Sequence, residues 1–251
     1  MAAGGDRARS LGERLGDDVV GGWCQLPSAS TAEVMGSVGW DFVCVDTQHG
    51  LIGDDTLLPI LRALDATGTP TLVRVATNAP EPIGRALDRG ADGVIVPLVD
   101  SAEQARAAVN ACHHPPRGTR SYGPTRVGWR AAATGAAPVC VVMIETRAGV
   151  AALGEIVAVE GLDAVFVGPS DLALAVGKPL DAQHGSDPEY DTLLGSIASR
   201  CREAGLPAGI YSASPAHVQR YRRLGFTFFA VMSDVSLLRA AAAARLAESR
   251  G

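Results

Sequence analysis

The sequence predicts an α/β protein, a (β/α)8 TIM barrel built as a single domain over residues 1–251. Three observations predict this fold class: short apolar runs alternate with helical patterns, the runs are hydrophobic throughout, and there are eight of them, the number that closes a barrel. An open, doubly wound Rossmann-type sheet is the alternative. It would need a glycine-rich turn after the first strand, where this chain reads LPSA, so the barrel is favoured.

The expected strands are rich in β-branched residues and are bounded by turn residues. They are Val19 to Leu26, Phe42 to Asp46, Thr71 to Val75, Gly93 to Pro97, Val139 to Glu145, Ala164 to Gly168, Ala208 to Tyr211 and Phe228 to Met232. The segments between them carry apolar residues at three- and four-residue spacing, as in Ala102 to Ala111 and Pro215 to Leu224. Residues 1–18 precede the first strand and are expected to form an N-terminal helix or arm.

Two stretches interrupt this rhythm. His113 to Ala137 is long and has little periodicity, and loops of this length tend to be functional or to contact a neighbour. Gly177 to Pro188 is rich in glycine, proline and aspartate and is expected to be a surface loop.

Composition excludes several classes of partner. The formal net charge is −5 and no basic tract occurs, so neither nucleic acid nor an anionic membrane is an expected partner. No apolar run approaches the roughly 20 residues that span a bilayer, and the N-terminus lacks the apolar core of a secretory signal. The five cysteines are widely spaced without a CxxC pair, which indicates reduced thiols and a cytoplasmic protein.

Polar residues gather where the expected strands end, and in a barrel these ends surround one site. They are Gln25, Asp46, Gln48, His49, Arg74, Glu145, Ser170, Asp171, Tyr211, Ser212, Ser233 and Asp234.

Glu145 and Asp171 follow neighbouring strands, and carboxylates with water suit a hard divalent cation such as Mg²⁺ or Mn²⁺. Capping of the following helices is the alternative role for both acids. Arg74 is expected either to stabilise developing oxyanion charge or to form a structural ion pair. His49, in a polar loop beside Asp46, is a candidate general base, with core packing as the alternative.

The lysine count separates two aldolase mechanisms. Barrel aldolases stabilise a carbanion through a Schiff-base lysine or through a metal. Lys178 is the single lysine of the chain and lies in a Gly-Lys-Pro turn, which excludes the imine route. A phosphate site after the last two strands is not expected either, because Asp234 would repel the anion.

Several motifs resemble the class II (metal-dependent) pyruvate aldolase family of the HpcH/HpaI type. They are VDTQHG, LVRV, ALDRGADGVIVPLV, PPRGTRSYGPTR, IETRAG, VFVGPSDLALAVG and GFTFFAV. The similarity extends from about Gly22 to Leu238. It implies a pyruvate-type barrel that reversibly cleaves a 4-hydroxy-2-oxo acid to pyruvate and an aldehyde through a metal-bound enolate.

The resemblance also implies a role for each matching residue. Glu145 and Asp171 would bind the divalent metal ion (Mg²⁺, Mn²⁺ or Co²⁺), and Arg74 would steady the enolate oxygen. His49 and Asp88 would form a proton-handling dyad, with Asp46 organising its loop. The backbone around Gly168, Pro169 and Ser170 would hold the pyruvate carboxylate.

The assembly that the resemblance implies is a homo-oligomer, a hexamer or trimer of dimers, that exchanges C-terminal helices. The alanine-rich segment SLLRAAAAARLA would be that helix, or would simply complete the barrel.

Two departures from the family pattern leave related reactions open. Gln48 stands where many members have glutamate, and Met143 stands where many have glutamine. Oxaloacetate decarboxylation and a biosynthetic carbon–carbon condensation are therefore alternatives, and a non-catalytic oligomeric subunit is a further one. The loop from His113 to Arg130 is expected at the rim and to set part of the specificity, where its arginines would favour an acidic aldehyde such as a semialdehyde; a solvated loop or subunit contact is the alternative. They are Arg117, Arg120, Arg126 and Arg130.

Overall fold

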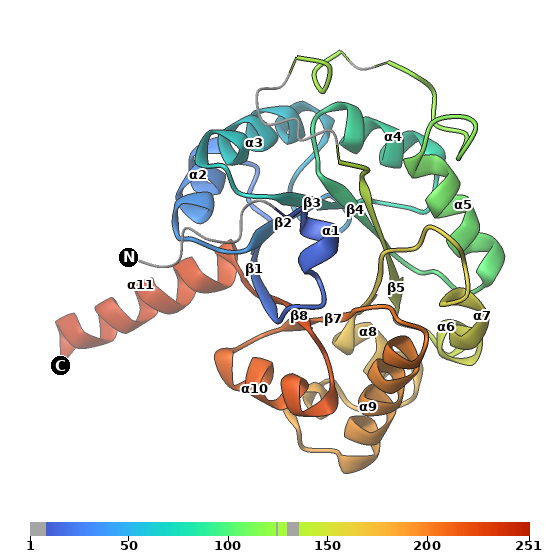
Figure 1. Cartoon of the computed structure of the whole chain (residues 1–251). Helices are drawn as coiled ribbons and strands as arrows, with labels where there is room; N and C mark the ends of the chain where they lie inside the picture. Colours follow the sequence, from blue (N-terminus) through green and yellow to red (C-terminus); the bar gives the residue numbers. More distant parts are fainter. Residues whose placement is uncertain (1–8, 124, 130–135) are drawn as a thin grey trace.

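The computed structural model describes residues 9–123, 125–129 and 136–251, and these form a closed barrel of eight parallel strands (Figure 1). Each strand pairs with the next, and β8 pairs with β1 to close the ring. The strands are β1 Val19–Cys24, β2 Phe42–Asp46, β3 Thr71–Arg74, β4 Gly93–Val96, β5 Val139–Ile144, β6 Ala164–Val167, β7 Ala208–Ser212 and β8 Phe228–Ser233. The expected barrel and all eight strands are confirmed, with ends that differ by at most two residues from those expected.

Helices surround the barrel on the outside, and α1 covers the amino-terminal end of the barrel, over the middle of the ring in the view of Figure 1. The helices are α1 Leu11–Arg14, α2 Ala29–Ser37, α3 Asp54–Thr67, α4 Pro80–Asp88, α5 Ala102–Cys112, α6 Arg147–Ala151, α7 Leu153–Ile156, α8 Pro169–Ala175, α9 Pro188–Glu203, α10 Pro215–Leu224 and α11 Asp234–Arg250, with a 3₁₀ turn η1 at Leu180–His184. None of the helices in the described ranges is both long and apolar enough to cross a bilayer.

The first strand is shorter than expected because its last two residues turn into the rim. The backbone N–H groups of Gln25 and Leu26 donate to the two carboxylate oxygens of Asp234, at 2.9 and 3.1 Å. These bonds replace the strand ladder, so β1 ends at Cys24. The buried Asp234 thus joins the start of α11 to the carboxyl-terminal end of β1.

Strand residues alternate between two apolar cores, as a period of two requires. Val43, Val45 and Val73 face outward and pack beneath the helices. Phe42, Cys44 and neighbouring inward residues fill the barrel itself. The amino-terminal end of the barrel is sealed by Leu11 and Leu15 of α1 and its flank, which join this inner core.

The long segment after α5 does not lie at the rim that was expected for it. Its described residues, 113–123, 125–129 and 136–137, follow the end of α5 and precede the start of β5, and they lie at the amino-terminal end of the barrel, opposite the polar strand ends. Arg120 pairs there with Asp88, and Arg126 pairs with Asp65. Within one chain these arginines therefore do not select an aldehyde, and Arg130 lies outside the described residues.

Candidate active site

The carboxylate of Asp46, the last residue of β2, is fully buried and forms a fork-shaped ion pair with Arg74 at the end of β3. Arg74 Nε and Nη2 donate to the two carboxylate oxygens at 2.9 and 2.6 Å, and Trp23 Nε1 donates to Oδ2 at 3.2 Å. Burial by itself would raise the pKa of Asp46. The hydrogen bonds and charge of Arg74 outweigh it and hold that pKa below its usual range.

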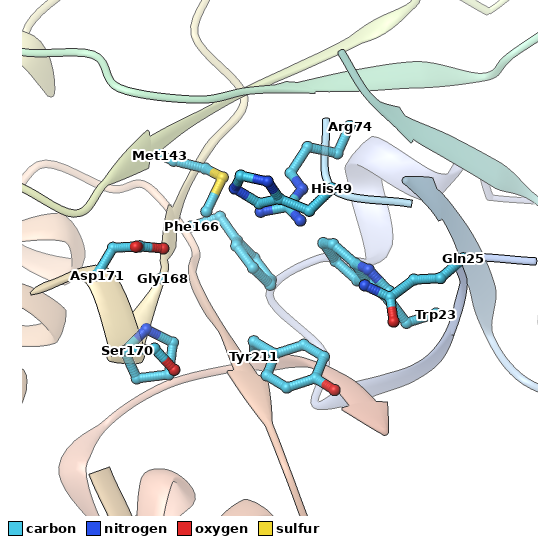
Figure 2. Close-up of a pocket in the computed structure, with 11 residues that line it drawn as sticks. Trp23, Gln25, His49, Arg74, Met143, Phe166, Gly168, Ser170, Asp171 and Tyr211 are labelled. Carbon is cyan, nitrogen blue, oxygen red and sulfur yellow. The ribbon is translucent and has the colours of Figure 1, made fainter. Parts of the chain in front are cut away.

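The turn after Asp46 is held by the same pair. The backbone N–H groups of Gln48 and His49 donate to Asp46 Oδ1 at 3.1 and 3.2 Å, and Thr47 donates twice to the carbonyl of Arg74. Gly50 closes the turn, because a Cβ there would lie 2.1 Å from the carbonyl oxygen of Asp46. The result is that the His49 imidazole lies beside Arg74 and Met143 (Figure 2).

Glu145 directly follows β5 and is 3% exposed. Its Oε1 accepts a hydrogen bond from the backbone N–H of Leu98 at 2.8 Å, and no hydrogen bond among the described residues uses Oε2. Burial, reinforced by the negative charge of Asp171, raises the pKa of Glu145 despite the Leu98 hydrogen bond. A buried carboxylate with an unused oxygen is suited to a cation.

Asp171 lies in the first turn of α8 and is exposed to the cavity. The N-cap of α8 is Gly168, and no side-chain hydrogen bond caps this helix. The alternative role of a helix cap is therefore not what the structure shows for Asp171.

The donor set fits a magnesium-type ion. Among residues 9–123, 125–129 and 136–251, no three histidine, cysteine or acidic side chains converge as metal ligands. Mg²⁺ is commonly held by one or two carboxylates, with water and substrate oxygens as the other ligands. Glu145 and Asp171 supply that number of carboxylates.

One cavity of about 220 Å³ opens among these residues (Figure 2). Its lining consists of Trp23, Gln25, His49, Arg74, Met143, Phe166, Gly168, Pro169, Ser170, Asp171 and Tyr211.

The opposite side of the cavity from Asp171 is aromatic, with a Trp23–Phe166 stack at 6.0 Å and a Trp23–Tyr211 edge contact at 5.5 Å. The guanidinium of Arg74 lies 5.0 Å from the centre of the Trp23 ring. Sequence reasoning missed Trp23 and Phe166, although the inward parity of their strand positions was a usable signal.

The structure brings together most of the expected site residues. His49, Arg74, Gly168, Pro169, Ser170 and Asp171 line the cavity. Asp46 and Glu145 stand immediately behind the lining, against Arg74 and Gly168 respectively. The departure at Met143 changes the cavity wall, whereas Gln48 does not line it, and its side-chain oxygen is buried without a hydrogen-bond partner among the described residues.

Asp88 is the exception. It is the last residue of α4, a helix that starts at the pocket end of the barrel and ends at the other, and it pairs with Arg120. A dyad of His49 and Asp88 is therefore not formed within one chain.

Two carboxylates, an arginine and a histidine lie together where the strands of this closed barrel end. This arrangement is typical of barrel enzymes that use a divalent metal. Comparison with known proteins agrees. The model of the HpcH/HpaI aldolase/citrate lyase family matches residues 20–241. The chain belongs to this family. It is a metal-dependent aldolase, a carbon–carbon lyase that cleaves a 4-hydroxy-2-oxo acid to pyruvate and an aldehyde.

Individual relatives cover nearly the whole chain. The chain is 40% identical to the 2-dehydro-3,6-dideoxy-6-sulfogluconate aldolase of Pseudomonas putida, over 87% of this chain and 88% of that protein. It is 35% identical to the hydroxypyruvate/pyruvate aldolase of Rhizorhabdus wittichii, over 94% and 95%. A solved structure of an HpcH/HpaI aldolase/citrate lyase family protein from Burkholderia cenocepacia superposes with a TM-score of 0.86 at 30% identity, covering 96% of this chain and 99% of that one.

Proposed function

We propose that Glu145 and Asp171 hold the divalent cation of this aldolase and that pyruvate binds beside it in the 220 Å³ cavity. The observation that carries the proposal is the placement of Glu145. It is a buried carboxylate with one oxygen that makes no hydrogen bond among the described residues, and it lies beside the cavity wall that bears the carboxylate of Asp171. Bound there, the cation supplies Lewis acidity that makes the pyruvate methyl group acidic.

The remaining residues have separate roles in the proposed reaction. Arg74, kept rigid by its fork to Asp46, presents positive charge where the enolate oxygen develops. His49 holds or moves the proton of the aldehyde-derived oxygen, since its ring lies in the same cavity and its backbone is fixed by Asp46. The backbone of Gly168, Pro169 and Ser170, at the start of α8, binds the pyruvate carboxylate.

The residues that would set the aldehyde partner are the aromatic ones. Arg74 is the one arginine or lysine that lines the cavity among the described residues, and Asp46 already pairs with it. The chain's own wall of Trp23, Phe166 and Tyr211 favours a neutral aldehyde over an acidic one.

The exposed apolar residues of the last helix support an oligomer. Helix α11 projects from the barrel (Figure 1), and Leu238 and Leu246 on it are 63% and 51% exposed. We infer that α11 packs on a second copy, in the hexamer or trimer of dimers expected for the family. Such an assembly is also what His49 needs to meet an Asp88, because the Asp88 of the same chain lies at the other end of the barrel.

The proposed compartment is the cytoplasm. All five cysteines are free and buried, which suits a reducing environment.

The experiment that tests the proposal is deuterium exchange at the methyl group of pyruvate, followed by proton NMR in D₂O with Mg²⁺, Mn²⁺ or Co²⁺. Exchange is expected with at least one of these metals, and it should stop on adding a chelator and in Glu145→Ala. Glu155→Ala, which removes an exposed glutamate on α7, is the matched control and should exchange like the unaltered chain. Full metal-dependent exchange in Glu145→Ala would exclude the proposed site.

A further inference from the structure

Leu98, two residues after β4, has a backbone conformation that leucine rarely adopts. Its φ is +55°, in the left-handed region, where the Cβ of an L-residue lies too close to the following carbonyl oxygen. The residue is 53% exposed, so packing does not account for the strain. Among the described residues, only Asp18 and Met232 share a positive φ without being glycine. An unfavourable conformation that packing does not explain indicates a functional constraint.

The strained turn points two successive N–H groups at the end of β5. Leu98 N–H donates to Glu145 Oε1 at 2.8 Å, and Val99 N–H donates to the carbonyl of Met143 at 3.3 Å. In an extended segment, successive N–H groups would point to opposite sides, so both could not face the same strand. The left-handed conformation at Leu98 removes that alternation and forms a small concavity of donors.

The second oxygen of Glu145 is confined from the other side. A Cβ added to Gly168 would lie 2.5 Å from Glu145 Oε2, so the carboxylate rests against the bare Cα of this glycine. The φ of Gly168 is −87°, which any residue adopts, so the need for glycine here is one of space and not of backbone conformation. The Glu145 carboxylate is thus held by the Leu98 N–H at Oε1 and lies with Oε2 in the space that the missing side chain of Gly168 leaves.

We propose that Leu98 and Gly168 are positioning residues that fix the Glu145 carboxylate in one orientation, with Oε1 on the Leu98 N–H and Oε2 turned toward the cation site shared with Asp171. This inference rests on the metal site of the proposed function. Pre-orienting the carboxylate means that binding a cation does not have to order it, which raises affinity for the metal. The role of Leu98 belongs to its backbone, so its side chain should be replaceable by any residue that tolerates a positive φ.

The test compares substitutions at Leu98 that differ in backbone preference. Leu98→Gly and Leu98→Asn accept a positive φ, whereas Leu98→Val and Leu98→Ile strongly disfavour it. Affinity of the full chain for Mn²⁺ is measured by calorimetry without pyruvate, so the readout does not depend on turnover. The glycine and asparagine variants should bind Mn²⁺ within about threefold of the unaltered chain, and the valine and isoleucine variants about 10-fold more weakly or worse.

Asp18→Val provides the matched control, because Asp18 is another left-handed residue (φ +63°) but lies before β1, at the opposite end of the barrel. It should lower the melting temperature without changing Mn²⁺ affinity. Gly168→Ala keeps the proposal testable if the β-branched variants at Leu98 do not fold, since its added Cβ meets the end of a side chain rather than backbone. It should also bind Mn²⁺ about 10-fold more weakly.

Wild-type Mn²⁺ affinity in Leu98→Val and Leu98→Ile, or in Gly168→Ala, would overturn the positioning role and leave the metal site intact. A chain that binds none of Mg²⁺, Mn²⁺ or Co²⁺ before any substitution would instead overturn the metal site itself, and the positioning role with it.

Discussion

At the amino-terminal end of the barrel the inner positions hold the rings of Phe42 and Phe228, 6.4 Å apart, whereas at the carboxyl-terminal end they lead to the buried pair of Asp46 and Arg74. Both ends are built by the same strands: Phe42 and Asp46 are the first and last residues of β2. One end is closed by apolar packing, and the other keeps charge in a cavity. Stability and chemistry are thus assigned to opposite ends of each strand.

The largest expected effect on chemistry comes from Arg74→Lys. Lysine keeps the charge but loses the two-pronged hydrogen bonding to Asp46 and the contact of the guanidinium with the Trp23 ring. The rate of metal-dependent pyruvate exchange should fall by about 100-fold, the scale of losing one preorganised donor. Arg14→Lys is the control, since Arg14 also pairs with an aspartate, Asp41, but at the amino-terminal end. An equal loss of rate in both variants would contradict the division between the ends.

Phe42→Ala should have the opposite effect to Arg74→Lys: it should lower stability and leave the exchange rate nearly unchanged. Removing a fully buried ring should lower the free energy of unfolding by about 3–5 kcal/mol, measured by urea denaturation, while the exchange rate per folded molecule changes less than about threefold. Gly21→Ala sharpens this test, because its Cβ would lie 2.4 Å from the Phe42 ring. The two changes should be strongly non-additive, since Phe42→Ala vacates the space that the new methyl group needs. A strictly additive pair would show that the ring does not require Gly21.

The smallest effect concerns pH. Burial, followed by the positive charges of Arg117 and Arg120, lowers the pKa of His113 at the amino-terminal end of the barrel. The unfolded chain therefore binds this proton more readily, so stability should decrease as pH falls through the ordinary histidine value of about 6.5. His113→Gln should flatten the dependence of the free energy of unfolding on pH below that value. An unchanged slope would show that His113 does not contribute to it.

The fold could be predicted almost completely from sequence, because continuous apolar runs and their number specify a closed parallel barrel. The exact strand ends could not. Gln25 looks like a strand residue in the pattern, yet a carboxylate more than two hundred positions away, that of Asp234, takes its N–H. Such a bond is a product of the tertiary structure and leaves no local signal.

The site likewise has residues that could be predicted from the sequence and residues that could not. Arg74, Glu145 and Asp171 could be predicted because polar residues at the ends of apolar strands must converge in a barrel. The position of Asp88 could not be deduced from a motif, since the end of the barrel it occupies depends on where α4 stops. The left-handed turn at Leu98 was equally hidden, because leucine has no preference for it and only the demand of Glu145 accounts for it.

The five cysteines are buried and are distributed over β1, β2, α5, β5 and α9. Their reactivity can therefore report local opening of these elements. Burial raises the pKa of Cys24, Cys44 and Cys201, so very little of the reactive thiolate form is present and the thiols are also shielded from solvent. Alkylating reagents can then reach them only when the surrounding segment opens. The time course of mass increase, with no label introduced, would therefore report how often the strands and helices of the barrel separate from one another.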